Sequence, residues 1–315
     1  MTRAGRRGPP MTDAAAMTAA RAEGLVTASF RRHFAVRQDD GDTIECVLRG
    51  RSMTLACGDR VHVARSEDGG VIEDMLPRTT LFYRSDAYRQ KLIAANVTQI
   101  VGVVAPDLGV DEELINRWIV AAEAERCRLV LVANKSDQPG FDNLLARLAP
   151  CAGLGYAVVP ISAKLDIGPL LPWLSGQRSV LIGQSGMGKS TILNAVMPGA
   201  AAKTAEISGA LSTGRHTTSH STLYLLPESV GGGWIVDSPG MKAFGLAHLA
   251  PEAIAAAFVE FRPLVGRCRF RDCRHDTEPG CALRDAVEKG VVAPYRLALM
   301  RSMIAESQAA RAPGR

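Results

Sequence analysis

The sequence lacks the features that would assign it to a membrane or secreted protein. Its apolar run Ile100–Ala105 is far shorter than the roughly 20 residues that a transmembrane helix needs. Residues 1–23 contain no apolar core of the kind found in a secretory signal. Seven cysteines, an odd number without a signal, argue against a disulfide framework. We therefore expect a cytoplasmic protein in a reducing compartment, with no membrane partner.

Aromatic residues are also scarce. They make up 5% of the chain, so stacking on bases is not expected to dominate any binding of nucleic acid. The net charge of +5 and the pI of about 8.9 are compatible with RNA binding without establishing it. A length of 315 residues suits two or three domains. Nothing in the sequence suggests a coiled coil, and we expect a monomer.

The N-terminal residues 1–23 are rich in Arg, Ala, Gly and Pro. We interpret them as a disordered tail. Two alternatives remain: a transit peptide, because the first dozen residues are basic and contain no acid, and translation from Met11.

A small β-barrel is predicted for residues 24–85. Short apolar segments alternate there with turns such as Asp39–Asp42 and Asp68–Gly70. Five strands in about 55 residues favour an OB-fold. Arginines on or beside these strands form either a solvated surface or a face that contacts phosphates. The arginines are Arg31, Arg32, Arg49, Arg51 and Arg60. The predicted strands are Leu25–Phe30, Phe34–Arg37, Thr43–Leu48, Arg60–Val63 and Val71–Met75.

An α/β domain is predicted for residues 86–248. Apolar strands alternate there with helical segments, which is typical of a parallel sheet covered by helices. The predicted strands are Gln99–Ala105, Arg128–Ala133, Ala157–Ile161 and Ser179–Ile182, and the predicted helices are Glu112–Glu125, Asp142–Leu148 and Ile167–Trp173.

Two nucleotide-binding motifs occur in this domain in an unusual order. The guanine-reading tetrapeptide Asn134–Asp137 comes before the phosphate-binding loop Gly183–Ser190, whereas ordinary GTPases have the reverse order. The sequence therefore predicts a circularly permuted P-loop GTPase domain.

The phosphate-binding loop follows a strand and precedes a helix, which is the context that the motif requires. Its glycines let backbone N–H groups surround phosphate oxygens. Lys189 is expected to reach the β- and γ-phosphates as a catalytic group, and Ser190 to ligate Mg²⁺. The residues predicted to bind the nucleotide here are Gly183, Gln184, Ser185, Gly186, Met187, Gly188, Lys189, Ser190 and Thr191.

Guanine recognition is assigned to two segments that each follow a strand. The Asp137 carboxylate can accept both N–H groups on the Watson–Crick edge of guanine, which adenine lacks. Asn134 supports the site, the stem of Lys135 covers the base, and the N–H of Ala163 faces O6. The second segment consists of Ser162, Ala163 and Lys164.

The γ-phosphate side of the site is predicted from two further segments. Asp237 follows a strand and would hold Mg²⁺ through water, and the N–H of Gly240 would meet the γ-phosphate. Met241 stands where many GTPases carry the Gln that orients water, so unstimulated hydrolysis should be slow. The first switch would lie at Gly214–Thr218.

In this switch, Thr217 or Thr218 would complete the Mg²⁺ shell, and the sequence does not choose between them. His216 is a candidate to orient the attacking water once a partner orders the loop. The alternative is a solvated histidine without a catalytic role.

A metal site is predicted in the C-terminal residues 249–307. Three thiols and one imidazole occur within 14 residues, which is the ligand set of a closed tetrahedral Zn²⁺ site. Four protein ligands leave no open position, so the zinc would be structural. The ligands are Cys268, Cys273, His275 and Cys281. A helix at Pro251–Phe261 and two short helices complete this α-rich domain, and residues 308–315 form a tail.

Together these motifs resemble the RsgA (YjeQ) family of small-ribosomal-subunit-dependent GTPases. The resemblance covers roughly residues 24–307 and rests on the motif order, the switch Gly214–Thr218, the segment Asp237–Gly240 and the run Cys268–Cys281. It implies an N-terminal OB-fold, a permuted G domain and a zinc domain. It also implies GTP hydrolysis stimulated by the small subunit late in its maturation, rRNA contacts from the flanking domains, and a hydrophobic residue at position 241.

The chain departs from the family pattern at Ser219, where a third Thr is common, and in its long N-terminal extension. Two alternatives remain beside the GTPase. One is a GTP-gated RNA-binding switch with negligible turnover, and the other is a GTPase that acts on another RNA, such as transfer RNA.

Overall fold

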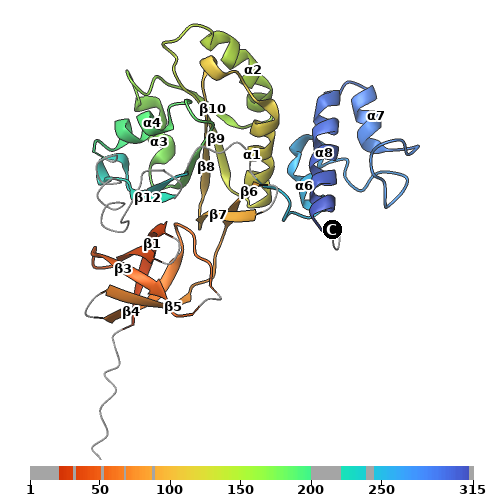
Figure 1. Ribbon diagram of the computed structural model, residues 1–315. Helices are drawn as coiled ribbons and strands as arrows, with labels where there is room; N and C mark the ends of the chain where they lie inside the picture. Colours follow the sequence, from red (N-terminus) through yellow and green to blue (C-terminus); the bar gives the residue numbers. More distant parts are fainter. Residues whose placement is uncertain are drawn as a thin grey trace, which may run out of the picture.

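The computed structural model describes residues 21–30, 33–50, 53–66, 69–86, 89–199, 221–238 and 245–311. Figure 1 shows a small β-barrel below a central sheet with helices on its faces, and a helical C-terminal unit beside helix α1. The predicted combination of OB-fold, permuted α/β domain and small helical domain is confirmed. Among the residues described, no helix is both long and apolar enough to cross a membrane.

The barrel is closed in the strand order β1-β2-β3-β5-β4-β1, in which only β3 and β5 are parallel. This is the arrangement expected for an OB-fold. Alternating residues such as Val26, Phe34 and Ile72 are fully or almost fully buried and fill its interior. The strands are β1 (Arg21–Phe30), β2 (His33–Gln38), β3 (Thr43–Leu48), β4 (Arg60–Ser66) and β5 (Gly69–Met75).

Two of the barrel arginines are paired with carboxylates. Arg60 contacts Glu23 at 2.8 Å and Asp39 at 3.0 Å, and Arg49 contacts Glu73 at 2.7 Å. Because these charges are partly neutralised within the barrel, they favour the interpretation as a solvated surface. Arg31, Arg32 and Arg51 lie outside the described residues.

The central sheet runs β10-β9-β8-β11-β13, all parallel, and ends with antiparallel β12. Helices cover both faces, and buried side chains such as Trp118 and Leu131 fill the space beneath them. The strands are β8 (Gln99–Val104), β9 (Arg128–Ala133), β10 (Ala157–Pro160), β11 (Arg178–Ile182), β12 (Thr222–Leu225) and β13 (Trp234–Asp237). The helices are η1 (Pro106–Leu108), α1 (Glu112–Ala124), α2 (Phe141–Gly153), η2 (Gly168–Leu170), α3 (Leu171–Leu174), α4 (Lys189–Val196) and η3 (Glu228–Val230).

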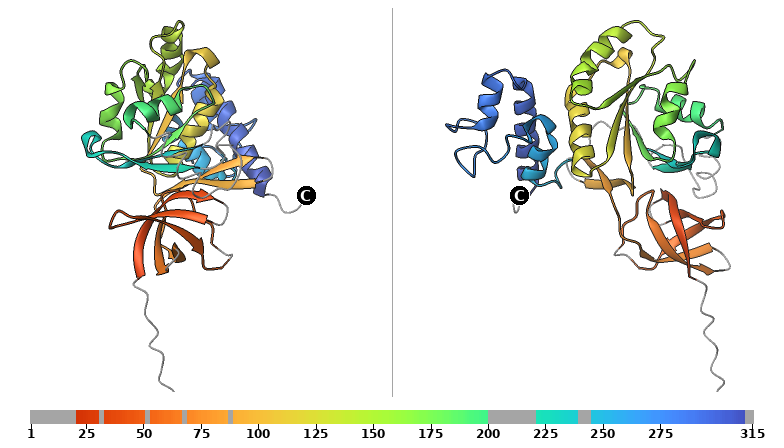
Figure 2. Two further views of the ribbon diagram at one scale, coloured as in Figure 1. Left: turned by 60° about the vertical axis from the view of Figure 1, so that its left-hand side comes forward. Right: turned by 180° about the vertical axis from the view of Figure 1, so that it is seen from behind.

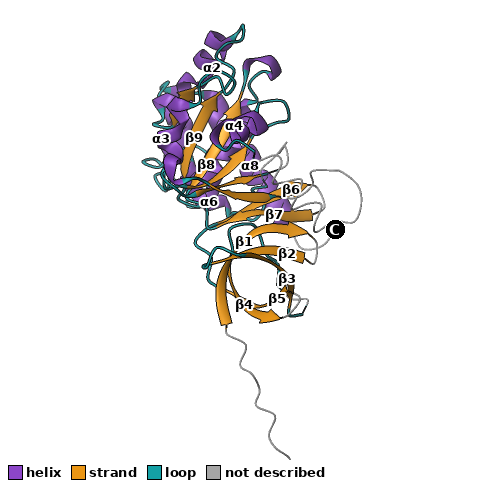
Figure 3. Cartoon of the chain, turned by 90° about the vertical axis from the view of Figure 1, so that its left-hand side faces the viewer, coloured by secondary structure: helices purple, strands orange, loops and turns teal. Residues whose placement is uncertain are grey.

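A hairpin that the sequence analysis did not predict connects the barrel to this sheet. Its strands β6 (Leu81–Asp86) and β7 (Arg89–Ala95) form a two-stranded sheet and cross the expected domain boundary at residue 85. Ala94 of β7 also forms a parallel bridge with Cys57 of the barrel. The barrel also joins the sheet directly, because Ala28 of β1 pairs with Thr222 of β12. Figure 3 shows the hairpin strands β6 and β7 between the barrel and the central sheet. The buried thiol of Cys57 donates to the carbonyl oxygen of Ser221 at 3.1 Å. The barrel and the α/β domain therefore share one continuous sheet.

The C-terminal unit packs against the outer side of α1 (Figure 2). Arg117 of α1 contacts Glu306 at 2.5 Å, and Arg262 contacts Glu123. The last helix continues to Arg311, beyond Gln308 where the tail was expected to begin. The elements of this unit are α6 (Pro251–Ala257), η4 (Val259–Phe261), α7 (Ala282–Glu288) and α8 (Pro294–Arg311).

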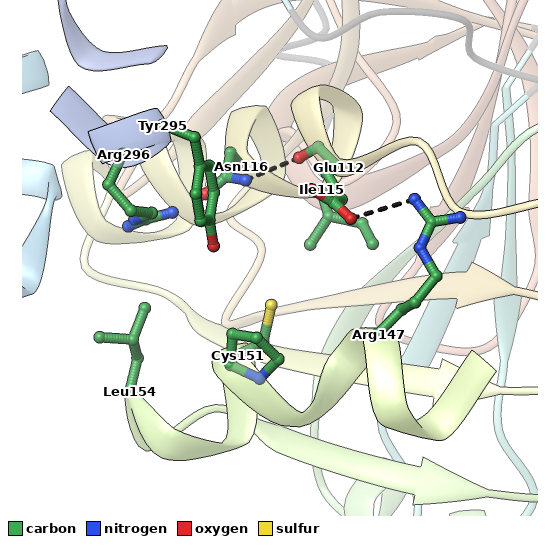
Figure 4. A pocket seen from close by; sticks show the side chains of 9 residues that line it. Glu112, Ile115, Asn116, Arg147, Cys151, Leu154, Tyr295 and Arg296 are labelled. Atoms are coloured by element: carbon green, nitrogen blue, oxygen red, sulfur yellow. Dashed lines mark hydrogen bonds and ion pairs between the residues drawn. The ribbon is translucent and has the colours of Figure 1, made fainter. Parts of the chain in front are cut away.

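A cleft of about 170 Å³ lies where α1 and α2 meet the start of α8 (Figure 4). Its arginines are paired: Arg147 contacts Glu112 at 3.0 Å, and Arg296 contacts Glu260. No residue of the nucleotide motifs lines this cleft. We therefore assign it to the packing of the two units rather than to the nucleotide site.

Candidate functional site

The predicted nucleotide motifs meet at one edge of the parallel sheet. Strands β8, β9, β10, β11 and β13 all end there, and the predicted segments follow β9, β10, β11 and β13. Ligands bind at the carboxyl ends of strands in open α/β sheets, because the loops and helix N-termini converge on that edge. The inverted order of the motifs along the chain therefore still produces one site.

The phosphate-binding loop connects β11 to α4 and has left-handed glycines. Gly188 has a φ of 96°, and a Cβ atom at this position would lie 2.2 Å from Nδ2 of Asn134. Only glycine combines this conformation with so close an approach. Within the loop, Met187 is buried, whereas Ser185, Gly186 and Ser190 are exposed. Thr191 is half-buried at the start of α4.

The ammonium group of Lys189 lies against the loop itself. Its Nζ donates to the carbonyl oxygens of Gly183 at 2.6 Å and of Gln184 at 2.9 Å. The side chain is buried, and this desolvation lowers its pKa although the nearby Asp237 acts in the opposite direction. The cation is thus already placed in the cradle where phosphates would bind.

Asp237 ends β13 on the other side of this cradle. Desolvation raises the pKa of its carboxyl group to about 6, while the charge of Lys189 lowers it. A divalent cation beside Asp237 would favour the ionised form. The position therefore fits a carboxylate that supports a bound cation.

Asn134 joins the two separate motifs. Its Nδ2 donates to the carbonyl oxygen of Met187 at 2.9 Å, and its Oδ1 accepts from the N–H of Ala163 at 3.0 Å. Its side chain is 2% exposed, so this amide is buried with both its donor and its acceptor used. One side chain therefore connects the phosphate-binding loop to both guanine segments.

The exposed Asp137 and the buried Ser162 are in contact at the predicted guanine site. Oδ1 of Asp137 accepts a hydrogen bond from Oγ of Ser162 at 2.6 Å, and this bond is the main cause of its lowered pKa. The carboxylate is therefore ionised at neutral pH and held at one oxygen. The adjacent Lys164 is exposed.

Two contacts of the β8–α1 segment were missed by the sequence analysis. Oδ2 of Asp107 lies 2.6 Å from Nζ of Lys135. Oδ2 of Asp111, whose other oxygen caps α1, accepts from Nε2 of Gln184 at 3.4 Å. No motif marks either aspartate, because the contacts bridge 28 and 73 residues. Their only sequence signal is a position between a buried strand and the start of a helix.

Most of the residues predicted to lie near the γ-phosphate are outside the part of the chain that the structure describes. This applies to the switch candidates His216, Thr217 and Thr218 and to Gly240 and Met241.

The four predicted metal ligands converge in the C-terminal unit. Their ligand atoms all lie within 4.8 Å of one another. The sulfurs of Cys268 and Cys281 are 3.9 Å apart, and Nδ1 of His275 lies 3.5 Å and 3.4 Å from them. Tetrahedral zinc would require about 3.8 Å between two sulfurs and about 3.5 Å between sulfur and nitrogen. The cluster, completed by Cys273, therefore fits a closed tetrahedral metal site.

The backbone around the cluster is shaped for this convergence. His275 adopts a left-handed φ of 62°, which is uncommon for a side chain other than glycine. The Glu278 carboxylate accepts from the N–H groups of Arg274 and Asp276 at 3.0 and 2.9 Å. These bonds lower the pKa of Glu278 to about 2. The loop therefore has hydrogen bonds of its own that support the convergence of the four ligand atoms.

Comparison with protein families finds a match over residues 75–247 to the RsgA GTPase family. A protein of Nitrosospira multiformis named small ribosomal subunit biogenesis GTPase RsgA is 49% identical over 92% of this chain and 92% of its own. A protein of the same name from Nitrosomonas europaea is 46% identical over 89% of this chain and 90% of its own.

Solved structures agree with these matches. The crystal structure of YjeQ from Thermotoga maritima is 32% identical, with a TM-score of 0.67, and the match covers 91% of this chain and 99% of that one. YloQ, described as a circularly permuted GTPase, shares the fold with a TM-score of 0.65 at 24% identity, over 96% of this chain and all of that one.

Proposed function

The chain belongs to the RsgA GTPase family, and on that premise we propose that it hydrolyses GTP on the immature small ribosomal subunit. The observation that carries the proposal is the buried amide of Asn134. It ties the phosphate-binding loop to Ala163, as a single guanine-nucleotide site requires. GTP hydrolysis itself follows from membership of the family.

We propose the following roles within this site. Asp137 reads the guanine edge, Asn134 and Ala163 complete the base pocket, and the loop N–H groups with Lys189 bind the phosphates. Mg²⁺ bound with the nucleotide would offset the charge of the β- and γ-phosphates, with Ser190 and Asp237 as its holders. The nucleotide-binding set is Asn134, Lys135, Asp137, Ser162, Ala163, Lys164, Gly183, Gln184, Ser185, Gly186, Met187, Gly188, Lys189, Ser190, Thr191, Thr217, Thr218, Asp237 and Gly240.

The proposed metal of the C-terminal cluster is zinc, in a structural role. The ligand separations and the three thiols support this choice, because thiolates favour zinc over Mg²⁺ or Ca²⁺. We also propose a cytoplasmic monomer with domain boundaries near residues 85 and 248. The hairpin β6–β7 spans the first of these boundaries, and helix α8 extends the last domain to Arg311.

The names of the relatives support the small subunit as the partner. A basic surface on the metal-binding loop supports contact with rRNA, because phosphates would pair with its free cations. None of the four loop arginines forms an ion pair with a residue that the structure describes, and all are exposed. These arginines are Arg267, Arg269, Arg271 and Arg274.

Binding to the subunit should depend on the nucleotide. We expect the protein to sediment with purified small subunits when a non-hydrolysable GTP analogue is present, and at least about tenfold less with GDP. Large subunits serve as the control. Equal binding to small and large subunits would contradict the proposal. Equal binding to the small subunit with the GTP analogue and with GDP would show that GTP does not regulate this binding.

His216 is our candidate for orienting the attacking water. Met241 lacks the hydrogen-bonding groups that a Gln would offer, so another side chain must supply them. We expect a His216→Ala variant to lose about 10²-fold in subunit-stimulated turnover with unchanged GDP affinity, which is the lower range for a positioned general base. Full stimulated turnover in this variant would exclude the role.

A further inference from the structure

We infer that Asp107 is a positioning residue for guanine binding, which it serves by holding the side chain of Lys135 in place. The inference rests on the proposed function, since it assigns Asp107 to the same nucleotide site. It adds a residue that belongs to neither the phosphate-binding loop nor the two guanine segments.

The topology of the sheet brings the two residues together. β8 and β9 are parallel neighbours, and Val104 at the end of β8 pairs with Ala133 at the end of β9. Asp107 follows β8 by three residues, and Lys135 follows β9 by two. Both therefore emerge at the same level of the nucleotide-binding edge.

The backbone holds Lys135 from both sides. The N–H of Asn134 donates to Val104 at 2.9 Å, and the N–H of Ser136 donates to Ile161 at 3.0 Å. Between them, Lys135 adopts a left-handed φ of 65°, an uncommon conformation for a side chain other than glycine. The backbone conformation therefore fixes the direction of the Cα–Cβ bond of Lys135.

The carboxylate of Asp107 then fixes the far end of the lysine. Nζ and Oδ2 are 2.6 Å apart, and 21% of the lysine side chain is exposed compared with 45% of the aspartate. The hydrogen bond from Lys135 lowers the pKa of Asp107, so the aspartate is charged at neutral pH. With both ends fixed, the four-carbon stem of Lys135 has little freedom to change its rotamer.

A fixed stem matters because a free lysine loses rotamer freedom when it packs against a base. If Asp107 already restricts the Lys135 side chain in the free protein, less conformational entropy is lost when the nucleotide binds. As a fold-stabilising interaction the pair is of little value, since exposed ion pairs contribute little to stability. Its effect should therefore appear in nucleotide affinity and not in the melting temperature.

The test compares the affinity for fluorescent GDP of the wild-type chain with that of two single variants, their double variant and matched controls. Asp107→Asn should raise the Kd roughly 3- to 10-fold, mainly through faster dissociation, with kcat at saturating GTP within about twofold of wild type. Lys135→Met keeps the stem but removes the ammonium, and should have a similar effect. The double variant should be no weaker than Lys135→Met alone, because both changes break one interaction.

Two controls make the result decisive. Asp142→Asn removes an exposed carboxylate of α2 that forms no ion pair with any described residue, and should leave the Kd unchanged. Asp107→Glu should restore part of the affinity. A Kd within twofold of wild type for Asp107→Asn, or additive effects in the double variant, would overturn the inference. If Asp137→Asn also left GDP binding intact, the proposed base site itself would be wrong.

Discussion

An Asp137→Asn variant should bind GTP at least about 10³-fold more weakly than the wild-type protein and should gain affinity for XTP. Guanine offers two N–H donors to the carboxylate, and an asparagine would present its own NH₂ group to one of them. A guanine N–H group that faces the asparagine NH₂ group loses its hydrogen bond, while the cost of removing it from water remains. Xanthine carries a carbonyl oxygen where guanine carries the amino group, so it can accept from the asparagine. Competition binding with GDP and XDP measures both changes.

The surroundings of Asp137 indicate that this substitution should not disturb the fold. Asp137 is exposed, and its one described side-chain partner is the hydroxyl group of Ser162 at 2.6 Å, which an asparagine oxygen can still accept. The fold should therefore be unaffected, with the same melting temperature as an Asp142→Asn control. An Asp137→Asn protein that still prefers GDP over XDP would contradict the assignment of the guanine site.

A Cys281→Ser variant should lose its metal and the order of the C-terminal unit. Structural zinc contributes apparent binding free energies of about 10–16 kcal/mol in small zinc domains, and serine is a poor ligand for it. Cys281 is 2% exposed at the start of α7, so loss of the metal would release that helix as well as the loop. Metal analysis of the purified protein and hydrogen exchange over residues 262–311 measure the two effects.

Cys151→Ser is the matched control for this prediction. Cys151 is a half-buried thiol of α2 outside the cluster, and its substitution should leave the metal content unchanged. GDP affinity should survive in Cys281→Ser, because no cluster residue belongs to the nucleotide site. A wild-type protein purified without a stoichiometric metal, or a Cys281→Ser protein with full metal content, would contradict the zinc assignment.

Local patterns were enough to predict most of the fold. The barrel strands alternate between apolar and polar residues with turns between them, and the helix expected after the phosphate-binding loop is α4 (Lys189–Val196). The hairpin β6–β7 was missed because Arg84, Ser85 and Asp86 interrupt its apolar pattern. The strand β12 is only four residues long and is positioned by its partners β13 and β1.

Long-range contacts limited the prediction of the site. Short motifs marked Asn134, Lys189 and Asp237, but the bond from Asn134 to Met187 spans 53 residues and required the sheet order. The pairing of Arg60 with Glu23 and Asp39 likewise depends on barrel closure, so the sequence left the role of that arginine open. The cluster of three cysteines and one histidine could be predicted, because all four residues lie within a segment of 14 residues.

The most direct test of the account is GTP turnover by the purified protein, alone, with small ribosomal subunits and with large ones. We expect slow turnover by the protein alone, because Met241 cannot orient water, and strong stimulation by the small subunit only. Loss of that stimulation in a Lys189→Ala variant would show that the stimulated turnover depends on the phosphate-binding loop. Absence of stimulation, with GTP-dependent binding to the subunit retained, would contradict the account and identify a GTP-gated RNA-binding switch with negligible turnover.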